Sequence, residues 1–154
     1  MKIIPRKLIS KIMIEVVSRQ RRREMDCERW QVFGEKALTA IGKAGHDATI
    51  AFVSDRQIKI LNKRFRRLSK PTDVLSFPAG DDKFTETSPP RLGDIAISVE
   101  RAESQAAENG LNFEKEIAQL ILHGLLHLCG YDHETDKGEM SRLELRLRGQ
   151  MGMR

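Results

Sequence analysis

The stretch from Asn112 to His133 reads NFEKEIAQLILHGLLHLCGYDH, and most of it has the pattern of a helix. Asn112 is suited to cap that helix, and Gly130 is suited to end it. Glu114 and Glu116 fall in the first turn, where they complement the positive end of the helix dipole. Apolar side chains follow at helical spacing: Ile117, Leu120, Ile121, Leu125 and Leu128. The pattern predicts a helix that is apolar enough to be buried.

Three of the four histidines of the chain lie near the end of this helix. His123 and His127 are four residues apart, so both imidazoles project from one helix face with Cβ atoms about 5 to 6 Å apart, as two ligands of a single metal ion must. A turn through a left-handed residue at Gly130 would bring His133 round to face them. No fourth protein ligand is evident, which leaves one tetrahedral position to water or substrate and is typical of catalytic zinc. We therefore expect one Zn²⁺ per chain, although imidazole also suits copper, nickel and iron.

Other interpretations of these residues are weaker. Isolated histidines are usually surface or satisfied core residues, but three at this spacing are not typical of either. The spacing matches the metzincin peptidase signature H-E-x-x-H-x-x-G-x-x-H, except that Gly124 stands where the peptidase has its general base. Cys129 would point about 200° away from His127 on a helix and is better described as a small buried hydrophobe. Asp132 is either an acceptor behind a ligand histidine or a turn residue, and His46 is a loop residue.

The segments around this helix predict a sheet packed with further helices. Apolar, β-branched stretches predict four strands, at Ile12 to Val17, Ala48 to Val53, Asp73 to Phe77 and Leu92 to Val99. Helical spacing predicts helices from Asp26 to Lys43, from Ser54 or Asp55 with a buried face of Ile58, Leu61, Asn62 and Phe65, from Glu100 to Glu108, and from Lys137 to Gln150. An irregular loop from Ala79 to Arg91 joins the last two strands. The predicted fold class is α+β, a mixed sheet of about four strands packed with helices, with the metal site on a helix of the C-terminal half and the turn after it.

Length and composition bound the organisation of the chain. Its 154 residues, 40% of them hydrophobic, suffice for one domain with its own core, so we expect residues 1–154 to form a single domain in which residues 1–11 are an additional segment. No apolar run approaches the roughly 20 residues that a membrane-spanning helix needs, and no secretory signal is evident. Cys27 and Cys129 fit neither a disulfide framework nor a four-thiolate zinc site. We expect a cytoplasmic protein without a membrane partner.

Positive charge is concentrated in the first half of the chain. Residues 1–70 contain 18 Lys and Arg against 7 Asp and Glu, whereas residues 71–154 contain 9 against 15. Two basic clusters account for the excess: Arg19 with Arg21, Arg22 and Arg23, and then Lys63, Arg64, Arg66, Arg67 and Lys70. Such clusters favour a polyanionic partner, although either could be ordinary solvated surface. With aromatic residues at only 5%, phosphate contacts are expected to dominate over base stacking.

Three motifs resemble those of one known family. They are Leu61-Asn-Lys-Arg-Phe-Arg66 leading to Lys70-Pro-Thr-Asp-Val-Leu-Ser-Phe-Pro78, then Leu92-Gly-Asp-Ile95, and then His123-Gly-Leu-Leu-His-Leu-Cys-Gly-Tyr-Asp-His133. Their order and spacing over residues 48–150 resemble the YbeY family of metal-dependent endoribonucleases, which cleave single-stranded RNA and mature rRNA. The resemblance implies a zinc-dependent nuclease in rRNA processing, including the 3′ end of small-subunit rRNA, and in ribosome quality control. It also implies rRNA and ribosomal particles as partners, together with ribosomal proteins or assembly GTPases.

The resemblance assigns roles to individual residues. The zinc ligands of the family are matched by His123, His127 and His133. Arg66 matches the functionally important arginine of the family, and a guanidinium can bind phosphate oxygens through two parallel hydrogen bonds. Arg66 and His123 are therefore the expected catalytic residues. The expected substrate-binding residues are Arg66, Lys70, Thr72 and Asp73, although Thr72 and Asp73 could equally cap a turn.

Two chemical routes stay open. Water activated by the metal attacks the phosphodiester directly, or the ribose 2′-hydroxyl attacks and leaves a cyclic phosphate. The first is slightly favoured, although glycine at position 124 leaves the general base unassigned. Two other functions remain as hypotheses: a metal-dependent peptidase, which Gly124 opposes, and a non-catalytic ribosome-assembly factor with a structural metal. The sequence makes no prediction of the oligomeric state.

Overall fold

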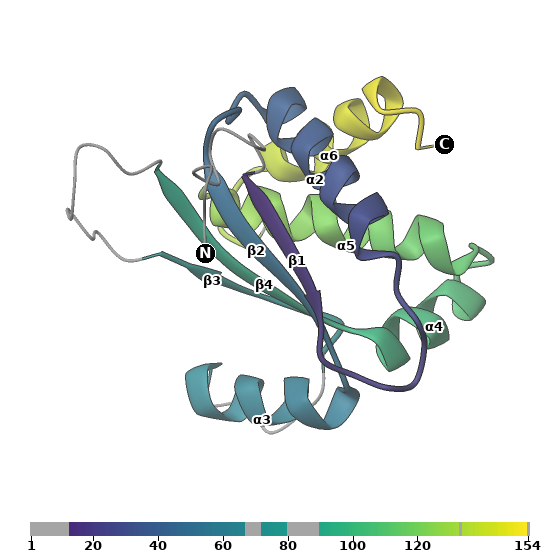
Figure 1. Cartoon of the computed structure of the whole chain (residues 1–154). Coiled ribbons are helices and arrows are strands. Elements are labelled where there is room, and N and C mark those ends of the chain that lie inside the picture. Colours follow the sequence, from purple (N-terminus) through teal and green to yellow (C-terminus); the bar gives the residue numbers. More distant parts are fainter. Residues whose placement is uncertain (1–12, 67–71, 80–89, 133, 154) are drawn as a thin grey trace, which may run out of the picture.

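The computed structural model describes residues 13–66, 72–79, 90–132 and 134–153. Over these residues the chain forms four strands and five helices (Figure 1). The strands are β1 (Ile14–Ser18), β2 (Asp47–Val53), β3 (Val74–Pro78) and β4 (Arg91–Ser98). The helices are α2 (Cys27–Ile41), α3 (Asp55–Arg66), α4 (Val99–Glu108), α5 (Phe113–Leu128) and α6 (Glu139–Gln150), and none of those described is both long and apolar enough to cross a bilayer. The predicted α+β class is confirmed, while the proposed additional segment 1–11 lies outside the described residues.

The four strands form one mixed sheet in the order β1-β2-β4-β3. β1 is parallel to β2 and β2 is parallel to β4, whereas β3 runs antiparallel to β4. A parallel pair needs a crossover connection, which α2 supplies between β1 and β2. β3 is thus an edge strand, and no other described strand pairs with its outer side.

Local sequence explains where the helices begin and end. At the start of α2, the Asp26 carboxylate accepts a hydrogen bond from the backbone N–H of Arg29 at 3.1 Å, and Gly42 follows the helix with a φ of 91°. Ser54 Oγ accepts from the Gln57 N–H at 3.0 Å in the same way at the start of α3. The predicted bounds of the strands and helices agree with the structure to within about two residues.

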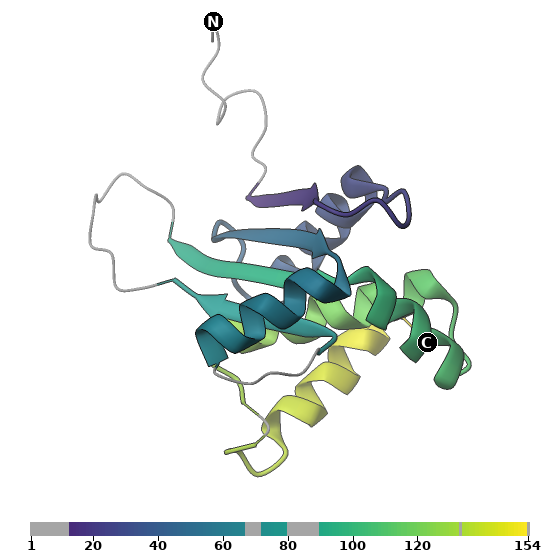
Figure 2. The same ribbon diagram turned by 90° about the horizontal axis from the view of Figure 1, so that it is seen from below.

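Helices α2, α5 and α6 cover one face of the sheet, and α3 lies alone on the opposite face (Figures 1 and 2). α5 lies at the centre of the main core, where eleven of its 16 residues are buried. Ile117, Ile121 and Leu125 are fully buried in the same cluster as Ile50 of β2. Burial of one such side chain contributes about 1.5–3 kcal/mol, so this helix holds the helical layer against the sheet. The predicted burial of this helix is confirmed.

Strands β3 and β4 approach each other closely at Gly93. This residue has a φ of 141°, and a Cβ atom there would lie 2.2 Å from the carbonyl oxygen of Phe77. Because no side chain fits, the Leu92-Gly-Asp-Ile95 motif needs glycine at this point. The pairing continues to Ala79, whose N–H donates to the Leu92 carbonyl at 2.9 Å. This contact fixes the edge strand β3 against the rest of the sheet.

The prediction for the end of α3 is wrong at one side chain. Phe65, expected on the buried face, is 57% exposed. Ile58 on the same helix face is fully buried in a small cluster against the sheet. Two turns further on, Phe65 instead meets the ring of Phe77 on the edge strand. The apolar pattern of α3 therefore continues beyond the part of the sheet that can bury it.

Candidate metal centre

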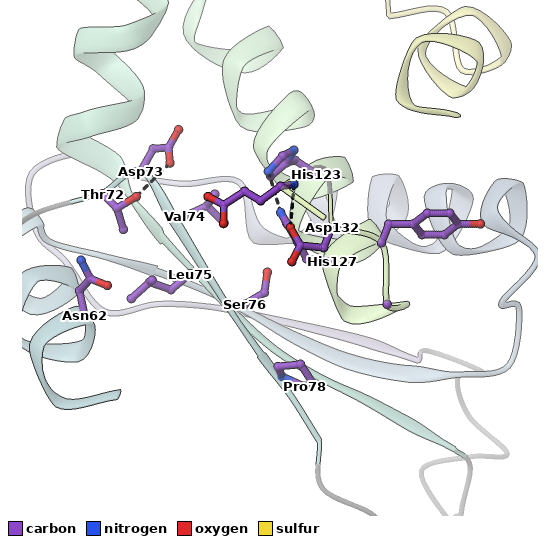
Figure 3. Close-up of a pocket in the computed structure, with 13 residues that line it drawn as sticks. Asn62, Thr72, Asp73, Val74, Leu75, Ser76, Pro78, His123, His127 and Asp132 are labelled. Atoms are coloured by element: carbon purple, nitrogen blue, oxygen red, sulfur yellow. Dashed lines mark hydrogen bonds between the residues drawn. The ribbon is translucent and has the colours of Figure 1, made fainter. Parts of the chain in front are cut away.

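A cleft of about 490 Å³ opens between the C-terminal end of α5, the edge strand β3 and one side of α3. Figure 3 shows the side chains around it. They are Asn62, Thr72, Asp73, Val74, Leu75, Ser76, Pro78, His123, His127, Gly130, Tyr131, Asp132 and Glu134. The structure therefore brings four of the predicted site residues into one cleft, namely Thr72, Asp73, His123 and His127.

His123 and His127 lie one turn apart on α5, and both rings reach the cleft (Figure 3). Their two Nε2 atoms are 3.0 Å apart, and the rings are inclined at 76° with centroids 4.6 Å apart. Two nitrogen ligands at about 2.0–2.1 Å from one tetrahedral zinc ion would be separated by about 3.3 Å. The pair thus has nearly the separation that a shared metal ion requires.

The ring of His123 is held from behind by Glu144 of α6. The Nδ1–H of His123 donates to Glu144 Oε1 at 2.8 Å, and Arg148 Nη2 donates to the other carboxylate oxygen at 3.3 Å. A carboxylate that accepts a hydrogen bond from Nδ1–H fixes the tautomer in which the proton is on Nδ1, so the lone pair of Nε2 faces the cleft. A histidine that binds a metal ion through Nε2 needs this tautomer. Sequence analysis missed Glu144, although a carboxylate between Met140 and Leu147 on the buried face of a helix was a usable signal.

The third predicted ligand, His133, lies outside the described residues. In the part of the chain that the structure describes, no group of three or more His, Cys, Asp and Glu side chains could hold a metal ion. The described nitrogen donors for a metal ion are the imidazoles of His123 and His127. Gly130, which has a φ of 98°, turns the chain along the cleft directly after α5. The spacing of the two imidazoles and the buried acceptor behind His123 fit zinc, and the third ligand stays a prediction.

Packing is tight for any side chain at Gly124. A Cβ atom there would lie 3.0 Å from two side-chain carbons of Ile95 on β4, which is tighter than ordinary contact. The carbonyl of Gly124 also accepts a hydrogen bond from Ser76 Oγ at 3.2 Å. The close approach of α5 to the sheet therefore favours glycine at this position, and a larger side chain requires Ile95 to shift.

The predicted substrate-binding residues are described only in part. Thr72 and Asp73 are half-buried just before β3, and Thr72 Oγ1 donates to Asp73 Oδ1 at 3.4 Å. Arg66 is the last residue of α3, but its side chain lies outside the described part of the chain, as does the whole of Lys70. Contacts of Arg66 and Lys70 with substrate stay predictions.

Asp132 closes the turn that follows α5. Its Oδ1 accepts a hydrogen bond from the Glu134 N–H at 3.0 Å, and its backbone carbonyl accepts from the Thr135 N–H at 3.2 Å. These bonds favour the turn interpretation of Asp132. Glu134 is a further carboxylate at the cleft, and no local signal distinguished it from the other acidic residues of this segment.

Two buried polar side chains, Asn62 and Ser76, also line the cleft. The predicted burial of Asn62 on α3 is confirmed, but sequence analysis gave it no role. An amide within an apolar stripe was the available signal for Asn62. Ser76 had none, because its place depends on how β3 pairs with β4 and packs on α5.

Glu116 lies in the first turn of α5, as predicted, and its side chain is buried there. The residue is 4% exposed. Burial raises the pKa of this carboxyl, a hydrogen bond with Asn109 partly offsets the rise, and the charge of Asp73 adds to it. Arg148 lowers the pKa and also holds Glu144. Buried polar groups therefore extend from the cleft into the contact between α5 and α6.

Comparison with known proteins points to one family. The sequence model of the family described as Endoribonuclease YbeY matches residues 15–152. An endoribonuclease YbeY of Myxococcus xanthus is 44% identical over 118 residues, which cover 75% of this chain and 40% of the relative. One of Solibacter usitatus is 48% identical over 99 residues, covering 64% of this chain and 62% of the relative, so the chain spans less than two thirds of either relative. The solution structure of TM1509 from Thermotoga maritima is similar with a TM-score of 0.60 and 28% identity over 90% of this chain and 91% of that one.

Proposed function

The chain belongs to the Endoribonuclease YbeY family, and from this membership we propose that it is a zinc-dependent endoribonuclease specific for single-stranded RNA. The observation that carries the proposal is the pair of histidine Nε2 atoms 3.0 Å apart at the cleft. We assign the activity to rRNA processing, including the 3′ end of small-subunit rRNA, and to ribosome quality control. The proposed partners are rRNA and ribosomal particles, with ribosomal proteins or assembly GTPases, in the cytoplasm.

His123 and His127 would hold one zinc ion per chain, with His133 as the predicted third ligand. A bound zinc ion would supply a Lewis acid for the negative charge that develops on the phosphoryl oxygens. The protein keeps the imidazole of His123 in place, because its Nδ1–H donates to Glu144 and Arg148 in turn donates to Glu144. A ring with a buried partner has little freedom to rotate, so the site is organised before substrate arrives.

The walls of the cleft suit a ribonucleotide. We assign the hydroxyl of Thr72 and the amide of Asn62 to hydrogen bonds with phosphate oxygens, and the Asp73 carboxylate to a ribose hydroxyl. Arg66 and Lys70 are the proposed sources of positive charge for the phosphate. Asn62 lines the cleft one turn before Arg66 on the same helix, which supports a phosphate contact for Arg66.

Gly124 opposes a peptidase, since it stands where that signature has its glutamate, and Ile95 crowds any side chain at this position. A non-catalytic assembly factor with a structural metal makes a different prediction. Removal of a histidine would then unfold the protein, because structural zinc binding is coupled to folding. The enzyme and the assembly factor therefore differ in what a histidine variant loses.

The test compares the zinc-loaded protein and His127→Ala on single-stranded rRNA fragments. His46→Ala is the matched control, because His46 lies between α2 and β2 and is not among the residues that line the cleft. We expect the wild type and His46→Ala to cleave, and His127→Ala to keep its circular dichroism spectrum while it loses about 100-fold or more in rate. A folded His127→Ala variant that cleaves at the wild-type rate would refute the proposal. An unfolded variant would favour the structural metal, and cyclic phosphate ends would assign the attack to the 2′-hydroxyl.

A further inference from the structure

Phe65 is an exposed aromatic ring near the cleft. More than half of its surface is accessible, although it lies on the helix face that α3 turns toward the sheet. Its ring meets the half-buried Phe77 ring at 69° with centroids 5.3 Å apart, and the guanidinium carbon of Arg64 is 5.6 Å from the Phe65 centroid. The contact with Phe77 supports the ring from one side, and its exposed surface is available to another molecule.

The Phe65 ring lies across the edge strand from the cleft. Phe77 packs against the small cluster that contains Ile58 of α3, whereas the hydroxyl of its neighbour Ser76 donates to Gly124 of α5, so the Phe77 side chain projects from the face of β3 opposite to α5. Phe65 follows Asn62, another lining residue, by about one helical turn. A nucleic-acid strand that leaves the cleft over the outer side of β3 would therefore reach Phe65, and no other described strand covers that side.

The exposed side of α3 is basic. The helix contains five Lys and Arg residues and one acidic residue, Asp55. The Asp55 carboxylate is already engaged, since it accepts a hydrogen bond from Ser98 Oγ at 3.1 Å. Arg56, Lys59 and Lys63 are exposed, and no carboxylate of the described residues forms an ion pair with them. The charge of this helix is thus complementary to a phosphate backbone.

We propose that Phe65 is a stacking site for one unpaired base beside the cleaved phosphodiester, with Lys59 and Lys63 contacting flanking phosphates. This inference deepens the proposed function and rests on it. An exposed aromatic ring can stack with any of the four bases, but only when the base is unpaired. Phe65 would therefore supply selectivity for single strands, which contacts with a phosphodiester alone do not provide.

The experiment measures binding of a single-stranded DNA decamer that contains 2-aminopurine, a probe that the proposed ribonuclease would bind without cleaving. Phe65→Leu keeps an apolar contact with Phe77 but removes the ring. We expect it to weaken binding about 5-fold to 100-fold and to abolish the stacking-dependent quenching of 2-aminopurine fluorescence. Phe65→Trp should retain both signals. The matched control is Ile60→Ala, which removes an exposed apolar side chain from the same helix and should bind as the wild type does.

Cleavage of single-stranded rRNA fragments separates this inference from the proposed function. We expect Phe65→Leu to raise KM and to leave kcat near the wild-type value, with an unchanged circular dichroism spectrum because the side chain is largely exposed. If the wild type quenches 2-aminopurine fluorescence, Phe65→Leu does not, and the wild type cleaves no RNA, the result would support the stacking site and refute the nuclease. Normal cleavage, binding and quenching by Phe65→Leu would overturn the stacking site, leave the nuclease intact and direct attention to a protein partner for the exposed ring.

Discussion

Helices α5 and α3 both line the cleft, but they are built in opposite ways. Eleven of the 16 residues of α5 are buried, and its His123 is held by a carboxylate of a neighbouring helix. Among the described side chains of α3, Ile58 and Asn62 are the buried ones, and the outer side is basic. A buried helix holds reactive groups in one geometry, whereas an exposed helix can contact a large and variable substrate. Substitutions in α5 should therefore change stability and metal binding, and substitutions in α3 should change RNA affinity.

The largest effect is expected at Gly124 of α5. Gly124→Glu would complete the H-E-x-x-H pattern, but its Cβ would meet Ile95 at 3.0 Å and its carboxylate would enter a packed region. We expect a loss of at least about 3 kcal/mol in the free energy of unfolding, measured in urea, and no peptidase activity. Gly124→Ala, which adds only the Cβ, should lose less. A Gly124→Glu protein as stable as the wild type would show that α5 is not packed tightly enough to differ from α3 in its tolerance of substitutions.

Metal affinity should be the next most sensitive quantity. Glu144→Ala removes the acceptor 2.8 Å from His123 Nδ1, so the ring loses its fixed tautomer and orientation. We expect zinc affinity to fall about 10-fold to 100-fold in competition with a chromophoric chelator. Glu139→Ala is the matched control, because Glu139 is exposed on the same helix and pairs with Arg142 at 3.6 Å. Equal affinities of the two folded variants would contradict a positioning role for Glu144.

Substitutions on α3 should give smaller effects, confined to RNA. Lys59→Ala and Lys63→Ala are each expected to weaken binding of single-stranded RNA a few-fold, and to reduce the slope of log affinity against log salt by about 0.7. Their unfolding free energies should stay near that of the wild type, because both side chains are exposed. Arg22→Ala is the control, since Arg22 Nε is already 2.7 Å from Glu103 Oε1. An equal change of salt slope for Arg22→Ala would remove the distinction between the two basic clusters.

Local spacing was sufficient to predict the elements of the fold and the histidine pair. Apolar, β-branched stretches identified the strands, and the predicted cap Asn112 accepts a hydrogen bond from the backbone N–H of Lys115. His123 and His127 meet because their four-residue spacing fixes their common face on any helix. Such features depend on neighbours within a few residues, which a single sequence displays directly.

Contacts between distant segments could not be predicted in this way. Glu144 meets His123 only because α6 packs on α5, and the sequence shows no more than a carboxylate within an apolar stripe. The exposure of Phe65 depends on how far α3 extends along the sheet, which its apolar pattern does not indicate. The two basic clusters looked equivalent in the sequence, which does not show that Arg22 and Arg23 pair with Glu103 about 80 positions away. Of the predicted site residues, His133, Lys70 and the side chain of Arg66 lie outside the described part of the chain.

The smallest effect is expected where the first basic cluster meets α4. Glu103 pairs with Arg22 at 2.7 Å and with Arg23 at 3.1 Å, and Arg23 lies 3.8 Å from the centre of the Phe113 ring. Burial alone would raise the pKa of Glu103, but the hydrogen bonds and charges of the two arginines lower it overall. A carboxylate with a lowered pKa stabilises the fold above its unfolded-state pKa, and this contribution is lost as the pH falls through the folded-state pKa.

Glu103→Gln is therefore expected to lower the Tm at pH 7 by no more than about 3 °C, measured by thermal unfolding. The difference from the wild type should shrink as the pH falls below about 4.3, the unfolded-state pKa of glutamate, and it should disappear once the pH is below the lowered folded-state pKa, where both states are protonated. Glu108→Gln, at the exposed end of the same helix, should differ little from the wild type at either pH. A Tm difference that does not change with pH would mean that Glu103 acts through packing alone. Arg22 and Arg23 would then resemble Lys59 and Lys63 of α3, for which the described residues provide no ion pair, and they should contribute equally to the salt dependence of RNA binding.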